Sequence, residues 1–200
     1  MSKIILATGN LGKVQEFQRI LTDCALEIIP QSHFNVTSIP ETGLTFVENA
    51  LLKARHAALQ TGLPALADDS GVIVDALKGA PGIYSARYGG ENATAEQNIQ
   101  KLLSALQEVP EAERTARFYC VLTLLRHPED PLPIIAEGIW EGKILLAPQG
   151  SEGFGYDPIF WVPEHQCSAA QLPEALKNCL SHRGQAMQNL LQKLRLCKLD

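Results

Sequence analysis

A short apolar run passes at once into a glycine-containing turn and then into a helix-like segment, and this order most constrains what the chain can fold into. The run covers residues 4–7 (Ile-Ile-Leu-Ala), the turn residues 8–13 (Thr-Gly-Asn-Leu-Gly-Lys) and the segment residues 14–21. Where a buried strand is followed by a helix through such a turn, the free backbone N–H groups and the positive end of the helix dipole point to the same place. The sequence therefore predicts a phosphate site in this turn.

The turn is not a Walker A loop. That motif has four residues between its glycines and a Ser or Thr after its lysine, whereas here two residues separate Gly9 from Gly12 and Val14 follows Lys13. A solvated lysine is one interpretation of Lys13. The other is that it binds phosphate, because a cation in the first turn opposes the helix dipole unless an anion also lies there.

Composition limits the class of protein. A chain of 200 residues with 46% hydrophobic content can bury one sizeable core, so we expect a single domain over residues 1–200, with room for two lobes. It has no apolar stretch near the ~20 residues of a membrane span, and its first residues lack the pattern of a signal peptide, so we expect neither feature. Five cysteines without a CxxC pair indicate reduced thiols in the cytoplasm, and the net charge of −5 argues against a nucleic-acid partner.

Helical and strand patterns alternate along the chain. Capping boxes at Thr45 with Glu48 and at Thr94 with Gln97 each precede a helix, and a last helix runs from Gly184. Strands are expected at residues 26–30, 65–67, 72–74, 117–125 and 134–144. Because the last two strands form a hairpin, the residues predict a mixed α/β sheet with helices on its faces.

The acidic pair Asp68-Asp69, followed by Ser70 and Gly71, has two interpretations. These residue types form ordinary turns, so a strand-to-strand turn is one. On extended backbone, in contrast, adjacent side chains point to opposite faces, and one acid would bind a metal or take a proton from water. Glu41 is a possible second metal ligand or simply a solvated charge.

Other polar residues leave similar alternatives. Asn49 and Lys53 share one helix face, where Lys53 is a second phosphate contact or part of a surface stripe. The aromatic residues of segment 153–158 (Gly-Phe-Gly-Tyr-Asp-Pro) form a hydrophobic cluster or a platform for a base. The spacing of four further residues does not match a common zinc site, and these are His165, Cys167, Cys179 and His182.

Seven segments, in order and over nearly the whole chain, resemble the inosine triphosphate pyrophosphatase family, whose members act on noncanonical purine nucleoside triphosphates. The segments are residues 8–13, 41–43, 48–54, 67–71, 81–87, 153–158 and 181–183. The resemblance implies an elongated mixed β-sheet flanked by helices, with two lobes around a central cleft. It also implies Mg²⁺, a homodimer, and hydrolysis of ITP, dITP or XTP to the monophosphate and pyrophosphate.

The resemblance further implies roles for individual residues. Asp69 would be the general base or a metal ligand, and Glu41 and Asp68 would help to hold Mg²⁺. The triphosphate would be held by Thr8, Gly9, Asn10, Leu11, Gly12, Lys13 and Lys53. Ser70 would contact substrate, and the base would be bound by Phe154, Gly155, Tyr156, Asp157, Lys177, His182 and Arg183.

One position departs from the family pattern. An acid usually precedes the lysine that corresponds to Lys177, but here Leu176 does. The positioning of Lys177 is therefore an open point, with Glu174 as a possible substitute for the acid.

Two other classes remain as alternatives. A regulatory nucleotide-binding module would gain little from the Asp68-Asp69 pair, because two acids repel a phosphate. A P-loop-like NTPase would need the missing Ser or Thr metal ligand.

Overall fold

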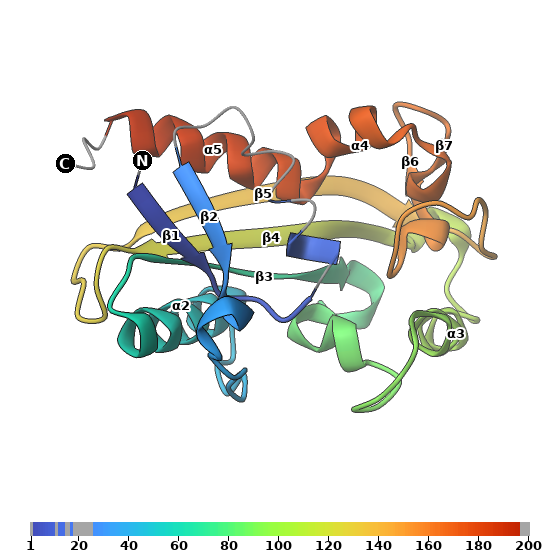
Figure 1. Cartoon of the computed structure of the whole chain (residues 1–200). Helices are drawn as coiled ribbons and strands as arrows, with labels where there is room; N and C mark the ends of the chain where they lie inside the picture. Colours follow the sequence, from blue (N-terminus) through green and yellow to red (C-terminus); the bar gives the residue numbers. More distant parts are fainter. Residues whose placement is uncertain (1, 11, 15–16, 18–25, 197–200) are drawn as a thin grey trace. The chain divides into compact units, whose positions relative to one another are not determined.

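The computed structural model describes residues 2–10, 12–14, 17 and 26–196 (Figure 1). The predicted helix over residues 14–21 lies mostly outside the described residues, of which residues 12–14 and 17 are helical. The helices are α2 (Phe46–Thr61), α3 (Ala95–Ala105), α4 (Glu174–Leu180) and α5 (His182–Leu196). The strands are β1 (Ser2–Leu6), β2 (Leu26–Pro30), β3 (Ala65–Val74), β4 (Thr115–Leu125), β5 (Ile134–Ile144), β6 (Phe160–Val162) and β7 (Cys167–Ser168).

These strands form one seven-stranded sheet in the order β2-β1-β3-β4-β5-β6-β7. β1 pairs in parallel with β2 and with β3, whereas β6 pairs antiparallel with β5 and with β7. β4 and β5 are neighbours joined by residues 126–133, a connection too short for a parallel crossover, so they form the predicted hairpin. The mixed α/β sheet flanked by helices is thereby confirmed.

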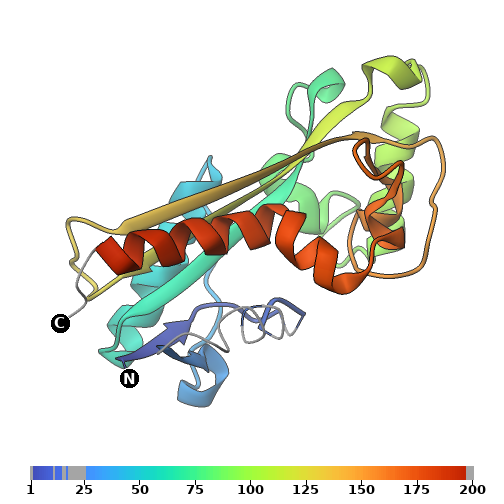
Figure 2. The same cartoon turned by 90° about the horizontal axis from the view of Figure 1, so that it is seen from above.

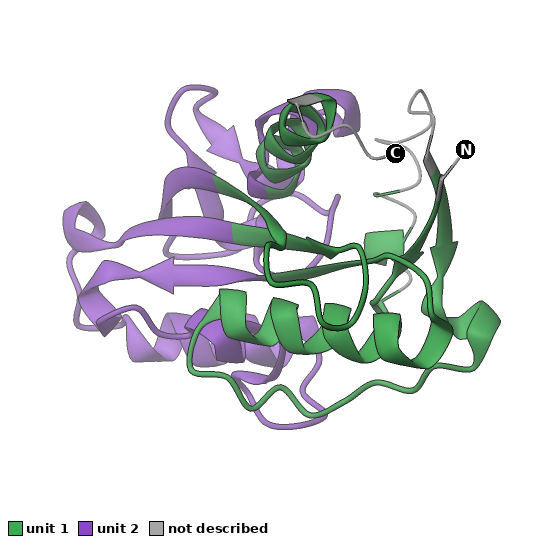
Figure 3. Cartoon of the chain, turned by 90° about the vertical axis from the view of Figure 1, so that its left-hand side faces the viewer, with its two compact units in different colours: residues 1–69, 120–138, 183–200 green, residues 70–119, 139–182 purple. Residues whose placement is uncertain are grey.

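The chain divides into two compact units (Figure 3). Unit 1 contains residues 1–69, 120–138 and 183–200, and unit 2 contains residues 70–119 and 139–182. The first passage from unit 1 to unit 2 lies between Asp69 and Ser70, inside β3. The single-domain prediction and the predicted central cleft stay predictions.

Unit 1 has a core on each face of its part of the sheet. On one face, Ala186, Met187 and Leu190 of α5 pack with residues of β1, β3 and β4. On the other, Ala54, Ala57 and Ala58 of α2 pack with Ala65 and Ala67 of β3. Figures 1 and 2 show the two helices on opposite sides of these strands, with α5 running along β5.

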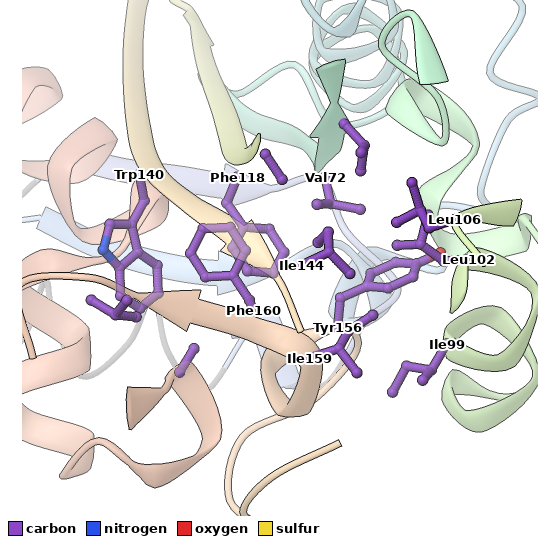
Figure 4. Packing of buried hydrophobic residues seen from close by; sticks show 14 of the residues in the cluster. Val72, Ile99, Leu102, Leu106, Phe118, Trp140, Ile144, Tyr156, Ile159 and Phe160 are labelled. Carbon is purple, nitrogen blue, oxygen red and sulfur yellow. The ribbon is translucent and has the colours of Figure 1, made fainter. Parts of the chain in front are cut away.

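Unit 2 has its own core, which is rich in aromatic residues (Figure 4). The rings of Phe118 and Trp140 both lie against Phe160, with centroid distances of 4.4 and 5.3 Å. Ile99, Leu102 and Leu106 supply the predicted apolar stripe of α3 and its end. This core supports the segment 153–158 through Tyr156 and Ile159.

Local signals placed the beginnings of α2 and α3 correctly, whereas α5 begins at His182, two residues before the predicted Gly184. The capping boxes at Thr45 and Thr94 are both present, with Glu48 and Gln97 bonded back to the cap backbone. α2 ends at Thr61 and is capped by Gly62, whose φ of 68° is left-handed. No helix within the described part of the chain is long and apolar enough to cross a membrane.

The main correction to the predicted elements is in β3. The segments 65–67 and 72–74 are not two strands separated by a turn, because β3 continues without interruption from Ala65 to Val74. The turn propensity of Asp, Ser and Gly is overridden by tertiary contacts of the two acids. The sequence patterns also missed β6, β7 and α4, each at most seven residues long.

Candidate functional site

Strand β3 turns its two adjacent acids to opposite faces of the sheet. Asp68 lies two residues from Leu66, which packs in the core beneath α5. Asp69 lies two residues from Ala67, which packs in the core beneath α2. Because side chains alternate along a strand, Asp68 shares the α5 face and Asp69 the α2 face. The extended backbone of the acidic pair is therefore confirmed, and each acid has its own surroundings, whereas the metal-binding or proton-accepting role stays a prediction.

On the α2 face, Lys53 joins two carboxylates. Its Nζ lies 2.7 Å from Oε1 of Glu41 and 3.2 Å from Oδ1 of Asp69. Lys53 comes from the second turn of α2, whereas Glu41 comes from the loop before that helix. The structure thus brings together three of the predicted residues, and we call Glu41, Lys53 and Asp69 the α2-face triad.

The protonation equilibria of the triad are perturbed. Burial raises the pKa of Asp69 above its ordinary value, and the neighbouring Glu41 and Asp68 charges add to this, while Lys53 and Lys13 oppose it. Burial alone would lower the pKa of Lys53, but the charges of Asp68, Asp69 and Glu41 raise it. A carboxylate with a raised pKa beside a firmly charged lysine is suited to accept a proton.

On the α5 face, Asp68 is held by cations. Its Oδ2 lies 2.6 Å from Nζ of Lys13 and 4.0 Å from Nε of Arg183. Burial would raise the pKa of Asp68, but the charges of Lys13, Arg183 and Lys53 outweigh it and hold that pKa well below its usual range. Asp68 is therefore a permanent anion that fixes Lys13 at the end of the glycine-containing turn.

The turn itself is organised by its own polar side chains. The Asn10 N–H donates to Oγ1 of Thr8, and the Lys13 N–H donates to Oδ1 of Asn10. Asn10 therefore caps the helical turn that begins at Gly12. Leu11 lies outside the described residues. Gly9, Asn10 and Gly12 are exposed, so the turn is accessible to a ligand.

In unit 2, Lys177 is held by the segment 153–158. Its Nζ donates to Oδ2 of Asp157 at 2.5 Å and lies 5.3 Å from the ring centroid of Phe154. Oδ2 of Asp157 also accepts from the Phe154 N–H. A Cβ on Gly153 would overlap Oδ2 of Asp157 and lie 2.7 Å from Nζ of Lys177, so glycine is required there. The ring of Phe154 is 49% exposed and can stack on a planar ligand.

Leu176, in place of the family's acid, packs against the unit 2 core. It lies next to Lys177, whose ammonium group is held instead by Asp157 and Phe154. Lys177 is thus anchored by residues of the segment 153–158 without a carboxylate at the preceding position, and the substitution by Glu174 stays a prediction.

Three more predicted residues lie deeper than the sequence indicated. Tyr156 is buried, and its hydroxyl donates to the Ser85 carbonyl at 2.8 Å. The ring of His182 stacks on Phe118 with a centroid distance of 4.7 Å and an interplanar angle of 12°. Ser70 is half-buried in β3. Tyr156 therefore anchors the segment that carries Phe154, and its predicted contact with the base stays a prediction.

The α2-face triad offers oxygen ligands that suit Mg²⁺. Oδ2 of Asp69 is buried and has no hydrogen-bond partner among the described residues, and Glu41 lies across Lys53 from it. Mg²⁺ commonly binds one or two carboxylates and completes its shell with phosphate oxygens and water. No group of three or more His, Cys, Asp or Glu in the described ranges is arranged to hold a metal by itself. The donor set therefore fits a metal held by these two carboxylates, with water or the oxygens of a phosphate ligand in its remaining positions.

Sequence patterns did not assign roles to three residues that support these clusters. Asn49, Ser85 and Phe118 contact Gly43, Tyr156 and His182 respectively. The contacts of Ser85 and Phe118 span 71 and 64 residues (85 to 156, and 118 to 182). A sequence pattern over a few residues cannot reveal contacts between such distant positions. Of the three, only Asn49 could be noticed from the sequence, because it lies one helical turn before Lys53.

Comparison with known proteins identifies relatives over nearly the full length. Residues 4–193 match the model of the Ham1 family. The dITP/XTP pyrophosphatase of Vibrio parahaemolyticus is 60% identical over 194 residues, covering 97% of each chain. That of Escherichia coli O157:H7 is 58% identical over 195 residues, covering 98% of this chain and 99% of the relative.

Solved structures agree with these matches. A HAM1 protein from Coxiella burnetii superimposes with a TM-score of 0.93 at 52% identity, covering 98% of this chain and all of that chain. A nucleoside-triphosphatase / dITP/XTP pyrophosphatase from Mycobacterium abscessus has a TM-score of 0.77 at 40% identity, over 94% of this chain and 98% of that chain.

Proposed function

This chain belongs to the Ham1 family, and from that premise we propose that it hydrolyses noncanonical purine nucleoside triphosphates (ITP, dITP and XTP) to the monophosphate and pyrophosphate. The names of its relatives support this substrate class. The observation that carries the proposal is the α2-face triad, in which Lys53 joins Glu41 and a buried Asp69 of raised pKa.

In the proposed reaction, water attacks the α-phosphorus and the α–β phosphoanhydride bond breaks. Asp69 orients the water and takes its proton, since its raised pKa makes it a better base than an ordinary carboxylate. Lys53 keeps Asp69 and Glu41 in place. Lys13, held by Asp68, contributes positive charge to the triphosphate together with the turn at residues 8–13.

We propose Mg²⁺ as the metal, held by Asp69 and Glu41, with Asp68 contributing by fixing Lys13 and through its negative charge. When bound, Mg²⁺ neutralises charge on the phosphate oxygens of the leaving pyrophosphate. We also propose that the chain acts as a homodimer in the cytoplasm. A measured solution mass of about twice the 21.8 kDa chain would support the dimer.

The unit 2 residues are proposed to select the base. Phe154 presents an exposed ring for stacking, and Lys177 supplies a donor fixed by Asp157. A purine with an oxygen at position six accepts from such donors, whereas adenine presents an amino donor there. A protein donor that faces the amino group of adenine would lose its hydrogen bond, which costs about 1–3 kcal/mol of binding free energy. His182 is proposed to add a further donor, and Arg183 of unit 1 is also proposed to bind the base.

Replacing Asp69 by Asn tests the proposal. The amide cannot take the proton from water, so we expect turnover of ITP to fall by at least about a hundredfold, within the range of a lost general base. Binding of ITP, measured by calorimetry with Mg²⁺, should stay detectable. Turnover near that of the unchanged chain would overturn the role of Asp69.

A substrate panel separates this proposal from its rivals. ITP, dITP, XTP, GTP and ATP are incubated with Mg²⁺, and pyrophosphate and phosphate are measured separately. We expect pyrophosphate, formed fastest from ITP, dITP and XTP. Release of phosphate would indicate a P-loop-like NTPase, and binding without products a regulatory module. Equal rates on ATP and ITP would refute the account of base selection.

A further inference from the structure

Asn49, which is not among the predicted site residues, forms a hydrogen bond with the loop that precedes α2. Its side chain lies fully buried in the first turn of α2, and its Oδ1 accepts the Gly43 N–H at 2.8 Å. Because the backbone N–H can only donate, the oxygen of the amide must face Gly43, which fixes the orientation of the whole group. Its Nδ2 is buried and has no hydrogen-bond partner in the described part of the chain.

The loop around Gly43 is pressed against the beginning of α2. A Cβ on Gly43 would lie 2.6 Å from Cβ of Glu48 and 2.8 Å from Oδ1 of Asn49, so only glycine allows this approach. The next two N–H groups, of Leu44 and Thr45, donate to Oε2 of Glu48. Three successive backbone donors are thus fastened to the first turn of one helix.

Glu41 lies two residues before the fastened Gly43, and Lys53 lies one helical turn after Asn49. The loop is therefore tied to α2 at both ends of this stretch: by Asn49 to Gly43, and by Lys53 to Glu41 at 2.7 Å. If the Gly43 contact is lost, the Leu44 and Thr45 bonds to Glu48 and the Lys53–Glu41 contact remain, but the described backbone bond to α2 that lies nearest to Glu41 in sequence is gone.

From this geometry we infer that Asn49 is a positioning residue, which holds Glu41 in the α2-face triad through the N–H of Gly43. This inference rests on the proposed function, in which Glu41 helps to hold a divalent metal. Asn49 touches neither substrate nor metal in this role. It sets where the Glu41 carboxylate stands relative to Asp69.

The choice of an amide at this position has a physical reason. An aspartate would accept the same N–H, but it would add a third carboxylate to a helix face that already opposes Glu41 and Asp69. The amide accepts without adding charge. Its Nδ2 is a buried donor that has no partner among the described residues, which is unfavourable. An apolar side chain would fill this space without that cost, so the presence of an amide favours a positioning role.

Two variants and one control test the inference. Asn49→Ala removes the acceptor, and Asn49→Asp keeps it. Thr94→Ala removes one hydrogen bond at the beginning of α3, in unit 2, and so matches the loss of a single bond at a helix N-terminus. Glu41→Gln, alone and combined with Asn49→Ala, shows whether Asn49 acts through Glu41.

The first measurement is amide hydrogen exchange at Gly43. We expect exchange to speed up about fivefold in Asn49→Ala and to stay within about twofold in Asn49→Asp and Thr94→Ala, since the loss of one net hydrogen bond corresponds to about fivefold. Unchanged exchange in Asn49→Ala would overturn the inference. This result does not depend on any enzymatic activity.

The second measurement is the affinity for Mn²⁺ alone, followed by the electron paramagnetic resonance of the free ion. We expect Asn49→Ala to weaken binding about tenfold, a typical loss for a group that orients a metal ligand, and Thr94→Ala to leave it unchanged. In the Glu41→Gln background, Asn49→Ala should change the affinity less than twofold.

The possible outcomes separate the two proposals. An equal loss from Asn49→Ala in both backgrounds, or no Mn²⁺ binding by the unchanged chain, would overturn the inference. Absence of triphosphate hydrolysis together with the expected Mn²⁺ pattern would overturn the proposed function alone.

Discussion

Asp68 and Asp69 are covalent neighbours with opposite electrostatic surroundings. Lys13 and Arg183 flank Asp68, and its pKa is held well below its usual range even though it is buried. Asp69 is also buried, but burial and neighbouring acids outweigh Lys53, and its pKa is raised. One acid therefore favours the folded state when charged, and the other when protonated.

Asp68→Asn should destabilise the fold. A lowered folded pKa contributes stability that is present above the unfolded value of about 3.9 and is lost as pH falls through the folded value. Removing the charge leaves Lys13 and the buried Arg183 without their anion, at a cost of about 3 kcal/mol. Urea unfolding at pH 7 measures this. Unfolding at the midpoint of the unchanged chain would contradict it.

Asp69→Asn should behave in the opposite way. A raised folded pKa contributes stability that is present below the unfolded value and is lost as pH rises through the folded value. The amide has no such loss, so at pH 7 the variant should be at least as stable as the unchanged chain, although we expect its turnover to be much lower. Thermal unfolding in EDTA from pH 4 to pH 8 tests this, and a clearly lower melting temperature at pH 7 would contradict it.

At the scale of elements, the hydroxyl of Tyr156 is one of the long-range contacts that hold the segment 153–158. The Tyr156 hydroxyl fastens it to the 3₁₀ helix Gly82–Arg87, in which Ser85 lies. Ser85 in turn accepts the Val72 N–H on its Oγ. The stacking ring of Phe154 thus depends on a hydroxyl that lies inside the core.

Tyr156→Phe should loosen this segment. Loss of one buried hydrogen bond corresponds to about 1 kcal/mol, so we expect KM for ITP to rise roughly fivefold, with kcat within twofold. Tyr84→Phe is the matched control, because Tyr84 is 53% exposed and should change neither constant. Steady-state kinetics on ITP decides this, and a fall in kcat with unchanged KM would contradict it.

Elements with local signals could be predicted, and elements made by tertiary contact could not. The helices capped at Thr45 and Thr94 carry their N-terminal signal within four residues. The middle of β3 consists instead of residues that are typical of turns. It is nevertheless extended, and the cations that contact its two acids come from distant segments of the chain. α4, β6 and β7 are too short to show a period.

At the scale of the whole molecule, ligand binding should stabilise the fold. In Asp69→Asn, ITP with Mg²⁺ at about 100 times its dissociation constant adds about 2.7 kcal/mol. For a chain of 200 residues this raises the melting temperature on the order of 5–10 °C. Differential scanning fluorimetry measures the shift. An equal shift with ATP would contradict the proposed selection of the base.

The sequence could predict which residues belong to the candidate site, but not which of them contact one another. Seven short segments indicated which residues to consider, but spacing could not assign Lys53 to Asp69 and Lys13 to Asp68. That assignment depends on which face of β3 each acid occupies and on which helix covers that face. The supporting contacts of Asn49, Ser85 and Phe118 depend on the same packing.

The alternation along β3 also limits how this chain can change. Counting from Leu66, even-numbered side chains of this stretch meet α5 and odd-numbered ones meet α2. Deleting one residue such as Ala67 would invert that parity for both acids, sending each carboxylate to the other's cations. Which acid can accept the proton thus depends on whether its position along β3 is odd or even, as much as on its residue type. Substitutions can accumulate around it, but single insertions and deletions between Leu66 and Asp69 cannot.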